Sequence, residues 1–411
     1  MRLMAGAATK ATAVWVLRRL RRAGFRAVLA GGCVRDMLLG LRSTDYDVAT
    51  DATPRQVKRL FAHVLLVGAK FGVAVVVRRR RTVEVATFRS DLSYSDGRRP
   101  DAVRFSSPRE DAKRRDFTIN GMFYDPIAGE VIDYVGGRRD LARGVVRTIG
   151  RADERFAEDY LRMIRAVRFA VRLGFRVAPA TAEAVRRHAG RIVEISGERV
   201  FDELSKMLAA ATAADALRLM AKLALARHVF PELHAGARSA WAAAVRRVAA
   251  VAWRKDLELS LAALLGDLPA GEIVRIVRRW GGSNTLRAGL KWLAAHGEQW
   301  RRVEAMSAAE FRKLAGEDRF ERLRVLWRVR EREATGGVRH SRIAARRVRE
   351  IPGGVALPAA LIGGDDVLAM GLPEGPRVGK LLRAAYDAQL NGELTTRRQA
   401  LTWIRRQASD R

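Results

Sequence analysis

Residues 27–50 read AVLAGGCVRDMLLGLRSTDYDVAT, and this stretch decides the fold of the N-terminal part of the chain. Residues 27–30 are apolar and predict a short buried strand. Gly31 and Gly32 follow it and open a helix over residues 34–39, where glycine lets backbone N–H groups approach phosphate oxygens. Two adjacent glycines also make ordinary turns, so this pattern alone leaves both interpretations open.

Asp45 and Asp47 stand at the start of the next predicted strand, around residues 46–49. Side chains two apart on a strand share a face, so the two carboxylates would lie side by side while Tyr46 points away. Two like charges this close are costly unless a cation neutralises them. Their oxygens suit Mg²⁺, and a two-metal site activates an attacking hydroxyl and stabilises a leaving group. A strand end with two solvated acids is the alternative.

A third carboxylate, Glu84, falls on a predicted hairpin of residues 73–77 and 82–88. It alternates with Val83 and Val85, so its side chain points to the opposite face from theirs, where it can join the aspartates. The alternative is a solvent-facing glutamate beside the arginine-rich turn of the hairpin.

The composition indicates a polyanionic partner. Lys and Arg number 77 against 45 Asp and Glu, which gives a net charge of +32. A codon bias toward arginine explains why Arg replaces Lys, but it does not explain the excess of basic over acidic residues. Charge alone does not separate RNA from DNA or an anionic membrane surface. No apolar run approaches the roughly 18 to 20 residues that span a bilayer, so no membrane partner is predicted.

Cysteine usage narrows the class of protein. The single cysteine, Cys33, excludes an internal disulfide framework and a cysteine-based zinc site. It fits a reducing compartment, and the cytoplasm is the expected location. We interpret Cys33 as a small packed residue rather than a nucleophile.

The chain of 411 residues is longer than one hydrophobic core normally serves, so we expect several domains. The N-terminal part mixes helix and strand patterns, and residues 89–105 are predicted as a polar loop. From residue 152 onward the pattern is helical, with breaks at glycine and proline. We place the expected domains at residues 1–150, 151–210, 211–335 and 336–411.

Three strings of this sequence resemble bacterial class II CCA-adding enzymes and their relatives, the bacterial poly(A) polymerases. They are the glycine string of residues 31–36, the aspartate string of residues 45–50 and RRDFTIN at residues 114–120. The likeness continues through residues 133–141, 158–162 and 198–204, so residues 27 to about 208 match in order and spacing. A weaker likeness covers residues 361–404.

The resemblance implies an α+β fold, in which a nucleotidyltransferase head with a small β-sheet flanked by helices precedes an all-helical neck, body and tail. It implies that Asp45 and Asp47 hold two Mg²⁺ ions and form the catalytic group with Glu84. Asp116 suits a hydrogen bond from a ribose hydroxyl, arginine suits the triphosphate, and Asn120 would brace their loop. The nucleotide-binding residues expected around this group are Gly31, Gly32, Arg35, Arg115, Asp116 and Asn120.

Base selection is predicted in the neck. Asp159 and Arg162 are three residues apart on a predicted helix, where they share a face. A carboxylate accepts from the exocyclic amine of cytosine or adenine, whereas uracil and guanine present a carbonyl there and leave a buried polar group unpaired. An intrahelical salt bridge between the two residues is the alternative. Arg165 and Arg168 continue this nucleotide-binding region and are expected to reach phosphates.

The function implied by the resemblance is the addition of CMP and AMP, from CTP and ATP, to the 3′ end of tRNA. Poly(A) polymerases share the head motifs but carry a basic Arg-Arg-Phe string where this chain reads Ala69-Lys70-Phe71. The possibility that the enzyme adds only CC or only A stays open. A non-catalytic RNA-binding protein is disfavoured because Asp45 and Asp47 are both present.

Basic helices of the body and tail are expected to hold tRNA through its phosphates, which are contacts that carry little sequence information. Lys380 follows Gly379 at a helix start opened by Pro376, and it is a candidate phosphate contact. A solvated lysine is the alternative. The sequence does not define protein partners.

Overall fold

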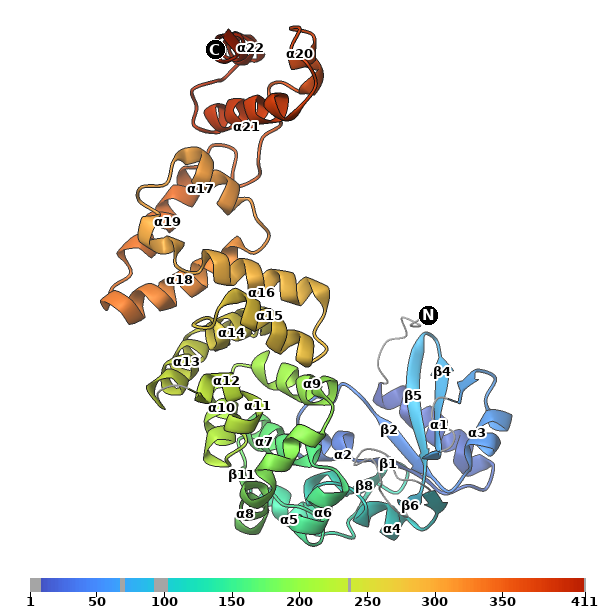
Figure 1. The fold of residues 1–411 in the computed structure, drawn as a ribbon. Coiled ribbons are helices and arrows are strands. Elements are labelled where there is room, and N and C mark those ends of the chain that lie inside the picture. The colour runs from blue at the N-terminus through green and yellow to red at the C-terminus, as the bar shows by residue number, and fades with distance from the viewer. Residues whose placement is uncertain (1–8, 67–70, 92–102, 236–237, 410–411) are drawn as a thin grey trace. The chain divides into compact units, whose positions relative to one another are not determined.

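The computed structural model describes residues 9–66, 71–91, 103–235 and 238–409, and Figure 1 shows its elements. The chain divides into two compact units, Met1–Trp241 and Ala242–Arg411. The first unit contains a β-sheet and its covering helices. The described part of the second unit is helical.

A seven-stranded mixed sheet is the largest sheet among the described residues of the first unit. In spatial order its strands are β3 Val64–Leu65, β4 Val73–Arg78, β5 Arg81–Thr87, β2 Asp47–Thr50, β1 Ala27–Ala30, β8 Phe123–Asp125 and β9 Glu130–Ile132. The central strand β2 runs antiparallel to β1 and parallel to β5. β4 and β5 form the predicted hairpin, which turns at Arg79 and Arg80 with φ of 47° and 59°.

Helices cover the sheet and then continue along the chain. They are α1 Lys10–Arg22, α2 Gly32–Leu38, α3 Pro54–Leu60, α4 Pro108–Lys113, α5 Gly137–Ala142, α6 Ala152–Glu158, α7 Leu161–Leu173, α8 Pro179–His188, α9 Gly197–Leu208, α10 Ala213–Lys222, α11 Ala226–Val229 and α12 Pro231–His234. The described residues of this unit also include the 3₁₀ helices η2 Thr118–Asn120 and η3 Ala189–Glu194. A reciprocal capping box between Thr53 and Gln56 begins α3.

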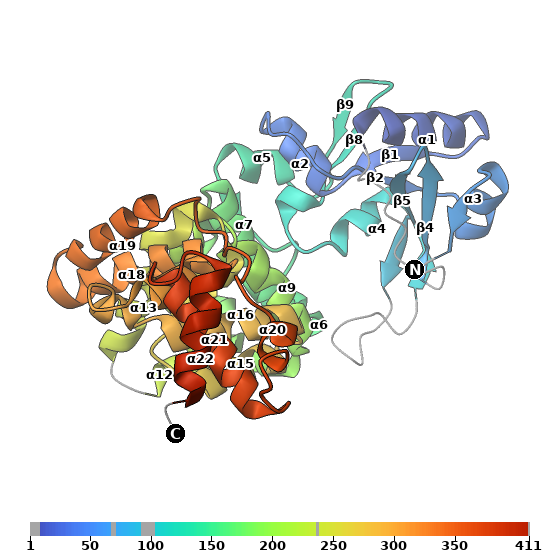
Figure 2. The ribbon, with the colours of Figure 1, turned by 90° about the horizontal axis from the view of Figure 1, so that it is seen from above.

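Alternation along the central strands builds two different faces. Leu29 and Val48 belong to the buried cluster that α1 and α3 cover, and both helices lie against the strands in Figures 1 and 2. Ala30 and Ala49 belong to a second cluster on the other face, which includes Phe88. The candidate carboxylates lie on this second face.

The second unit contains helices that pack on one another. They are α14 Leu257–Leu265, α15 Ala270–Arg279, α16 Asn284–His296, α17 Ala308–Ala315, α18 Phe320–Thr335, α19 Arg339–Glu350, α20 Gly364–Leu368, α21 Pro376–Leu390 and α22 Arg397–Ser409, with 3₁₀ helices η4 Ala252–Arg254 and η5 Gln299–Arg302. The boundary between the units falls within α13, Arg238–Val251. No helix in the described ranges is both long and apolar enough to cross a membrane.

Two expectations differ from the structure. The ends of the expected loop at residues 89–105 form a two-stranded sheet of β6 Arg89–Asp91 and β7 Val103–Phe105, and residues 92–102 lie outside the described residues. The neck is not purely helical, because β11 Arg176–Val177 pairs in parallel with β10 Val145–Val146. Gly174 ends α7 in the left-handed region and turns the chain into this pair, a turn that helical periodicity does not reveal.

Close packing at Gly137 gives a test of this fold. A Cβ at Gly137 would lie 2.3 Å from the Thr118 carbonyl oxygen and 2.6 Å from Met122 Cγ. We expect Gly137→Ala to lower the free energy of unfolding by about 1–3 kcal/mol, because the neighbours are buried and cannot move away freely. Gly190→Ala is the control, since its Cβ would meet only the His228 ring at 3.6 Å. Equal denaturation midpoints for the two variants would contradict the packing described.

Candidate active site

Asp47 and Glu84 lie on neighbouring strands and on one face of the sheet. Asp47 opens β2, and β5 runs parallel to β2 with Val85 beside Val48. Both valines point into the cluster beneath α1, so the residue before each of them points to the opposite face. This is the orientation that the alternation around Glu84 predicts.

Asp45 lies just before the strand instead of on it. β1 ends at Ala30, because Gly31 turns the chain into α2, and Ala30 is already paired with Asp47. No β1 residue is left opposite Asp45, whose Oδ1 accepts a hydrogen bond from the Tyr46 N–H at 3.0 Å. The expectation that both aspartates occupy one strand is therefore wrong, although the two remain close enough for their charges to interact.

The three carboxylates form an electrostatically unfavourable group. Burial, and then the negative charges of Glu84 and Asp45, raise the pKa of Asp47 from 3.8 to about 7. The pKa of Glu84 is also raised, by partial burial and by Asp45. The positive charge of Arg115 opposes the shift at Asp47 without cancelling it. A bound cation would favour the ionised carboxylates.

The donor set fits a hard divalent cation, because carboxylate oxygens are the ligands that Mg²⁺ prefers. Within the described residues, no group of three or more His, Cys, Asp or Glu side chains is arranged to hold a metal ion. Mg²⁺ commonly completes its coordination with water and substrate phosphates, so a site with fewer protein ligands suits it. The raised pKa of Asp47 is the observation that supports this fit.

Gly31 makes room for an arginine. Its φ of +75° lies in the region that glycine favours, and a Cβ there would lie 2.8 Å from Arg115 Nη1. The Gly31 N–H donates to the Met122 carbonyl at 3.1 Å, so it does not point toward a phosphate as the sequence suggested. Its contribution is the close passage of Arg115, while Gly32 begins α2 beside it.

Arg115 is held in place by Asp111, a buried aspartate on α4. Asp111 Oδ2 accepts from Arg115 Nε at 3.2 Å and Nη2 at 3.0 Å, and its Oδ1 accepts from Arg114 Nη2 at 2.7 Å. Burial favours the neutral acid, but the two guanidinium groups outweigh it and lower the pKa of Asp111. Arg115 Nη1 also donates to the Asn120 carbonyl at 3.4 Å. The guanidinium is thereby fixed close to the carboxylate group.

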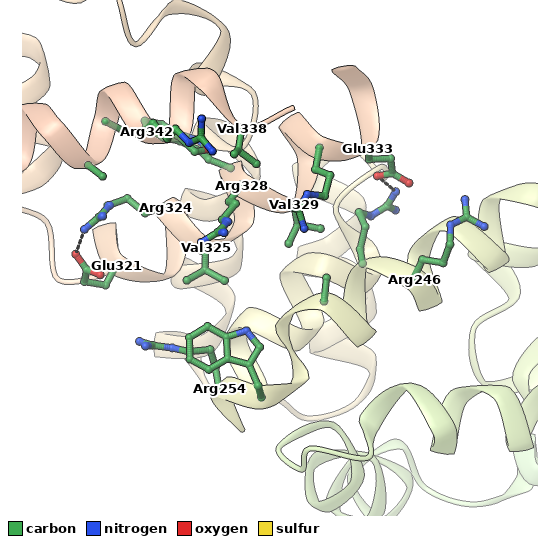
Figure 3. Close-up of a pocket in the computed structure, with 18 residues that line it drawn as sticks. Arg246, Arg254, Glu321, Arg324, Val325, Arg328, Val329, Glu333, Val338 and Arg342 are labelled. Atoms are coloured by element: carbon green, nitrogen blue, oxygen red, sulfur yellow. Dashed lines mark hydrogen bonds and ion pairs between the residues drawn. The ribbon is translucent and has the colours of Figure 1, made fainter. Parts of the chain in front are cut away.

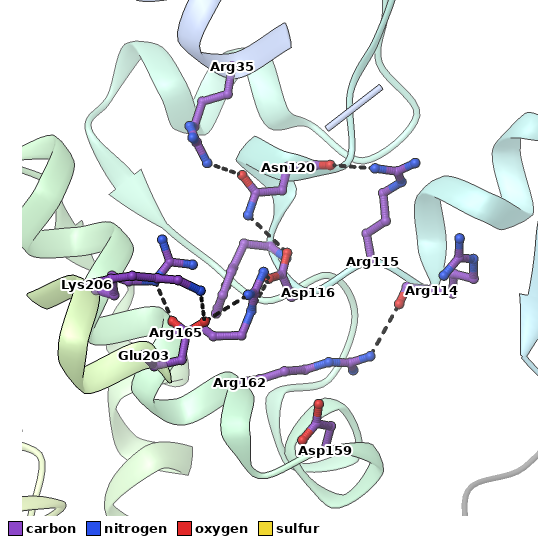
Figure 4. A network of polar contacts seen from close by, with 12 residues as sticks. Arg35, Arg114, Arg115, Asp116, Asn120, Asp159, Arg162, Arg165, Glu203 and Lys206 are labelled. Carbon is purple, nitrogen blue, oxygen red and sulfur yellow. Dashed lines mark hydrogen bonds and ion pairs between the residues drawn. The ribbon is translucent and has the colours of Figure 1, made fainter. Parts of the chain in front are cut away.

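Asn120 lies at the centre of the polar network in Figure 4. Its Oδ1 accepts from Arg35 Nη1 at 2.6 Å, and its Nδ2 donates to Asp116 Oδ1 at 3.0 Å. Arg35 is only 2% exposed and pairs with Asp36 at 2.6 Å. Asn120 therefore braces the loop, as the resemblance implies, and Arg35 supports Asn120 from inside the protein.

Asp116 connects this loop to helix α7. Its Oδ2 accepts from Arg165 Nε at 3.0 Å and Nη2 at 2.7 Å, and its Oδ1 accepts from Asn120 and from the Phe117 N–H. Burial favours the neutral acid, but the charge of Arg165 and the hydrogen bond from Asn120 lower the pKa of Asp116. These donors occupy the four acceptor positions of the carboxylate. A ribose hydroxyl can bind Asp116 only by displacing one of them.

Asp159 and Arg162 do not lie on one continuous helix. α6 ends at Glu158, Asp159 is extended with φ −159°, and α7 begins at Leu161, whose N–H donates to Asp159 Oδ1 at 3.1 Å. Aspartate favours such a position because its side chain replaces a missing helical acceptor. Asp159 Oδ2 pairs with Arg199 at 2.7 Å, and Arg162 pairs with Glu158 at 2.6 Å. The predicted continuous helix and the alternative Asp159–Arg162 salt bridge are both wrong.

Glu203 on α9 fixes the two arginines that were expected to reach phosphates. This carboxylate is 3% exposed, and it accepts from Arg165 Nη1 at 3.3 Å and from Arg168 Nε. The Arg168 guanidinium also lies 4.2 Å from the centroid of the Phe169 ring. A phosphate contact by either arginine would use its remaining N–H groups or replace Glu203.

Lys380 and Cys33 stand apart from this network. Lys380 is exposed on α21 in the second unit, and its role as a phosphate contact stays a prediction. Cys33 is buried, and burial raises the pKa of its thiol to about 11. A thiol that stays protonated at neutral pH is a poor nucleophile, so the interpretation of Cys33 as a packed residue is confirmed.

Sequence reasoning assigned no role to four residues that position the site. Asp111 precedes Arg114 and Arg115 by three and four residues, and helical spacing could have connected them. The contacts of Arg199 and Glu203 on α9 with Asp159 and with α7 have no local signal in the sequence. The four residues are Asp111, Glu158, Arg199 and Glu203.

Two family models match the first unit. One, described as "Poly A polymerase head domain", matches residues 27–147, and the other, "Probable RNA and SrmB- binding site of polymerase A", matches residues 174–236. The first match covers the strands and loops that carry the carboxylates and the Asn120 network. Fold, site and match together define a nucleotidyltransferase.

The similarity extends over nearly the whole chain. A CCA-adding enzyme of Geobacillus stearothermophilus is 35% identical over 401 residues, which cover 95% of this chain and 96% of that protein. A crystal structure of Bacillus stearothermophilus CCA-adding enzyme in complex with CTP is 31% identical, covers 96% of each chain and has a TM-score of 0.78. Poly(A) polymerase I of Escherichia coli O157:H7 is 44% identical over 232 residues, which cover 54% of this chain and 50% of that protein. This chain belongs to the family of class II CCA-adding enzymes and bacterial poly(A) polymerases.

Ionisation of Asp47 should make stability depend on pH. Its pKa is raised from 3.8 to about 7, so the folded protein retains a proton that the unfolded chain has lost, and the free energy of unfolding falls as pH rises between these values. In EDTA, we expect Asp47→Asn to abolish much of this fall and to be more stable than the wild type at about pH 8. Urea denaturation across the interval measures the difference.

Added Mg²⁺ supplies the companion measurement. A cation binds the ionised carboxylates, so it should stabilise the wild type at about pH 8 and have much less effect on Asp47→Asn. Asp215→Asn is the control, because Asp215 forms an exposed ion pair with Arg218 on α10. If Asp47→Asn shows the same pH dependence and the same Mg²⁺ response as the wild type, Asp47 is not the group whose ionisation and cation binding change the stability.

Proposed function

We propose that this chain adds CMP and AMP, from CTP and ATP, to the 3′ end of tRNA and so builds the CCA terminus. The extent of the similarity carries this proposal. The CCA-adding enzyme of G. stearothermophilus matches 95% of this chain, whereas poly(A) polymerase I of E. coli matches 54%. The head motifs are common to both kinds of enzyme, so they do not decide the product, and the match over the remaining chain favours CCA addition.

We assign the steps of this activity to successive parts of the chain, which we expect to act in the cytoplasm. The head catalyses transfer, the neck reads the base, and the helical body and tail hold the tRNA, with Lys380 as a candidate phosphate contact. The proposed head is residues 1–150, the neck 151–210, the body 211–335 and the tail 336–411.

Two Mg²⁺ ions are the proposed cofactor, with Asp45 and Asp47 as their protein ligands and Glu84 beside them. When bound, Mg²⁺ activates the attacking hydroxyl and stabilises the leaving pyrophosphate. The protein holds its carboxylates where their ionisation is unfavourable without a cation, as the raised pKa of Asp47 indicates. Metal binding and ionisation of the site are therefore coupled.

Arg115 is the proposed ligand of the triphosphate. Its guanidinium passes next to Gly31, and Asp111 and the Asn120 carbonyl hold it there. Arginine suits this role because its planar fork binds phosphate oxygens in pairs. Asn120 and Arg35 position Asp116, to which a ribose hydroxyl would bind in exchange for one of its donors.

Asp159 and Arg162 are proposed to read the base. Asp159 uses one lone pair on each oxygen for Leu161 and Arg199, which leaves acceptor capacity for an exocyclic amine of cytosine or adenine. Arg162 is anchored by Glu158, and its remaining N–H groups can donate to ring acceptors. Arg165 and Arg168, held by Glu203, are the proposed phosphate contacts of this region.

The product made on a tRNA that lacks its CCA end tests the function. With Mg²⁺, we expect a complete CCA end from CTP and ATP together, CC from CTP alone and no addition from ATP alone. Asp45→Ala and Asp47→Ala should abolish addition while the variants stay folded, and Asp215→Ala should behave as wild type. A long A tract would identify a poly(A) polymerase, and a product that stops at CC with both nucleotides would identify a CC-only enzyme.

Base choice provides a separate test of the neck. We expect Asp159→Ala or Arg162→Ala to reduce discrimination of CTP and ATP against UTP and GTP by about ten- to a hundredfold, because a buried hydrogen bond to the base is lost. Single-nucleotide incorporation measures kcat/KM for each nucleotide. Glu154→Ala, an exposed change on α6, is the control. Unchanged discrimination in both neck variants would limit the two residues to a structural role.

A further inference from the structure

Helices α13, α18 and α19 and the 3₁₀ helix η4 enclose a groove of about 960 Å³ within the second unit. Seven arginines and two glutamates line it, so its charge is strongly positive. Figure 3 shows Arg254 across the groove from Val325 and Arg328, with Arg342 on the neighbouring helix. None of these residues belongs to the candidate active site.

The two glutamates do not neutralise the groove. Glu321 is paired with Arg324 at 2.8 Å, and Glu333 is paired with the buried Arg247 at 3.0 Å. The remaining arginines are exposed, and no described residue forms an ion pair with them. They are Arg246, Arg254, Arg328, Arg332 and Arg342. Five exposed guanidinium groups thus converge on one cavity without a negative partner there.

The spacing of these arginines along α18 fits a chain of phosphates. Arg324, Arg328 and Arg332 are four residues apart, which places them in a row with a step of about 6 Å. This step is close to the distance between consecutive phosphates in a single nucleic-acid strand. Val325 and Val329 form a parallel apolar row on the same helix and line the groove with them.

An aromatic ring lies at the same groove. Trp253 is 64% exposed, which is unusual for so large an apolar side chain, and the Arg254 guanidinium lies 5.1 Å from the centroid of its ring. An exposed indole beside arginines is the combination on which unpaired bases stack. Bases in a duplex are already covered by their neighbours, so the ring favours an unpaired nucleotide.

We propose that this groove binds an unpaired RNA segment, with phosphates on the α18 arginines and a base on Trp253. The proposal rests on the proposed function in that the RNA is the tRNA substrate. An acidic peptide would satisfy the arginines but would leave the indole without a role. The groove therefore contributes to RNA affinity and not to the chemical step.

Charge reversal in the full-length protein tests the groove. We expect R328E/R332E to weaken binding of tRNA lacking its CCA end by at least about tenfold and to reduce the slope of log K against log salt by about 1.4–1.8. The KM for tRNA should rise, while kcat and the KM for CTP stay unchanged. R346E/R349E is the matched control, because it changes the net charge equally on α19 at exposed positions outside the groove.

Trp253→Ala tests the stacking contact independently. It should weaken binding of an unpaired oligoribonucleotide by about five- to a hundredfold, with little effect on the salt slope. If R328E/R332E does not fold by circular dichroism, R254A/R342A replaces it, since both side chains are exposed. An equal loss of affinity in the groove and control variants would overturn the proposal, and so would wild-type affinity in the groove variants.

The outcomes separate this proposal from the proposed function. If the wild-type protein adds nucleotides and the groove variants bind RNA normally, the proposed function stands and RNA binding by the groove is excluded. If the wild-type protein adds no nucleotide to tRNA and the groove variants lose RNA affinity, RNA binding by the groove stands and the proposed function is excluded.

Discussion

The ion pair between Asp116 and Arg165 is the contact on which the candidate active site depends. It joins the loop after α4 to helix α7, and each partner is bound a second time, Asp116 by Asn120 and Arg165 by Glu203. A buried ion pair contributes little net stability compared with apolar packing, but removing one partner leaves an uncompensated charge. The ion pair contributes here by fixing the positions of its two side chains. Glu203 on α9 is connected to Asp116 through one intermediate, Arg165, and Arg199 on the same helix pairs with Asp159.

The carboxylates of the candidate site are of two kinds, and their pKa shifts have opposite signs. Asp111 and Asp116 are surrounded by guanidinium groups, which lower their pKa values despite burial. Asp47 and Glu84 are close to another carboxylate, and their pKa values are raised. A sequence optimised for stability alone would pair or replace Asp47, because its ionisation opposes folding. Carboxylates left in this state are typical of a site completed by a ligand.

The sequence predicted those features of the fold and the site that depend on a local pattern of residues. Alternation around Glu84 places this side chain on the same face as Asp47, and the glycines after β1 mark the turn into α2, because strand periodicity and backbone freedom act over a few residues. The break at Asp159 was missed, since helical spacing on both sides hides a local hydrogen bond from the Leu161 N–H to the Asp159 side chain. The Arg199 and Glu203 contacts join helices some 35–40 residues apart, and no local rule predicts them. The groove of α13, α18 and α19 is invisible in sequence for the same reason.

The excess of positive charge is used differently in the two units. In the first unit the arginines of the site are bound by acids, which fix their geometry and reduce their capacity to attract an extended polyanion such as RNA. The exposed arginines at the groove of the second unit retain that capacity. The part of the chain shared with poly(A) polymerase I of E. coli has the higher identity, 44% over 232 residues. Transfer chemistry is common to both enzymes and constrains the head closely. The RNA contacts proposed for the second unit are with phosphates, and many arrangements of arginine satisfy that requirement.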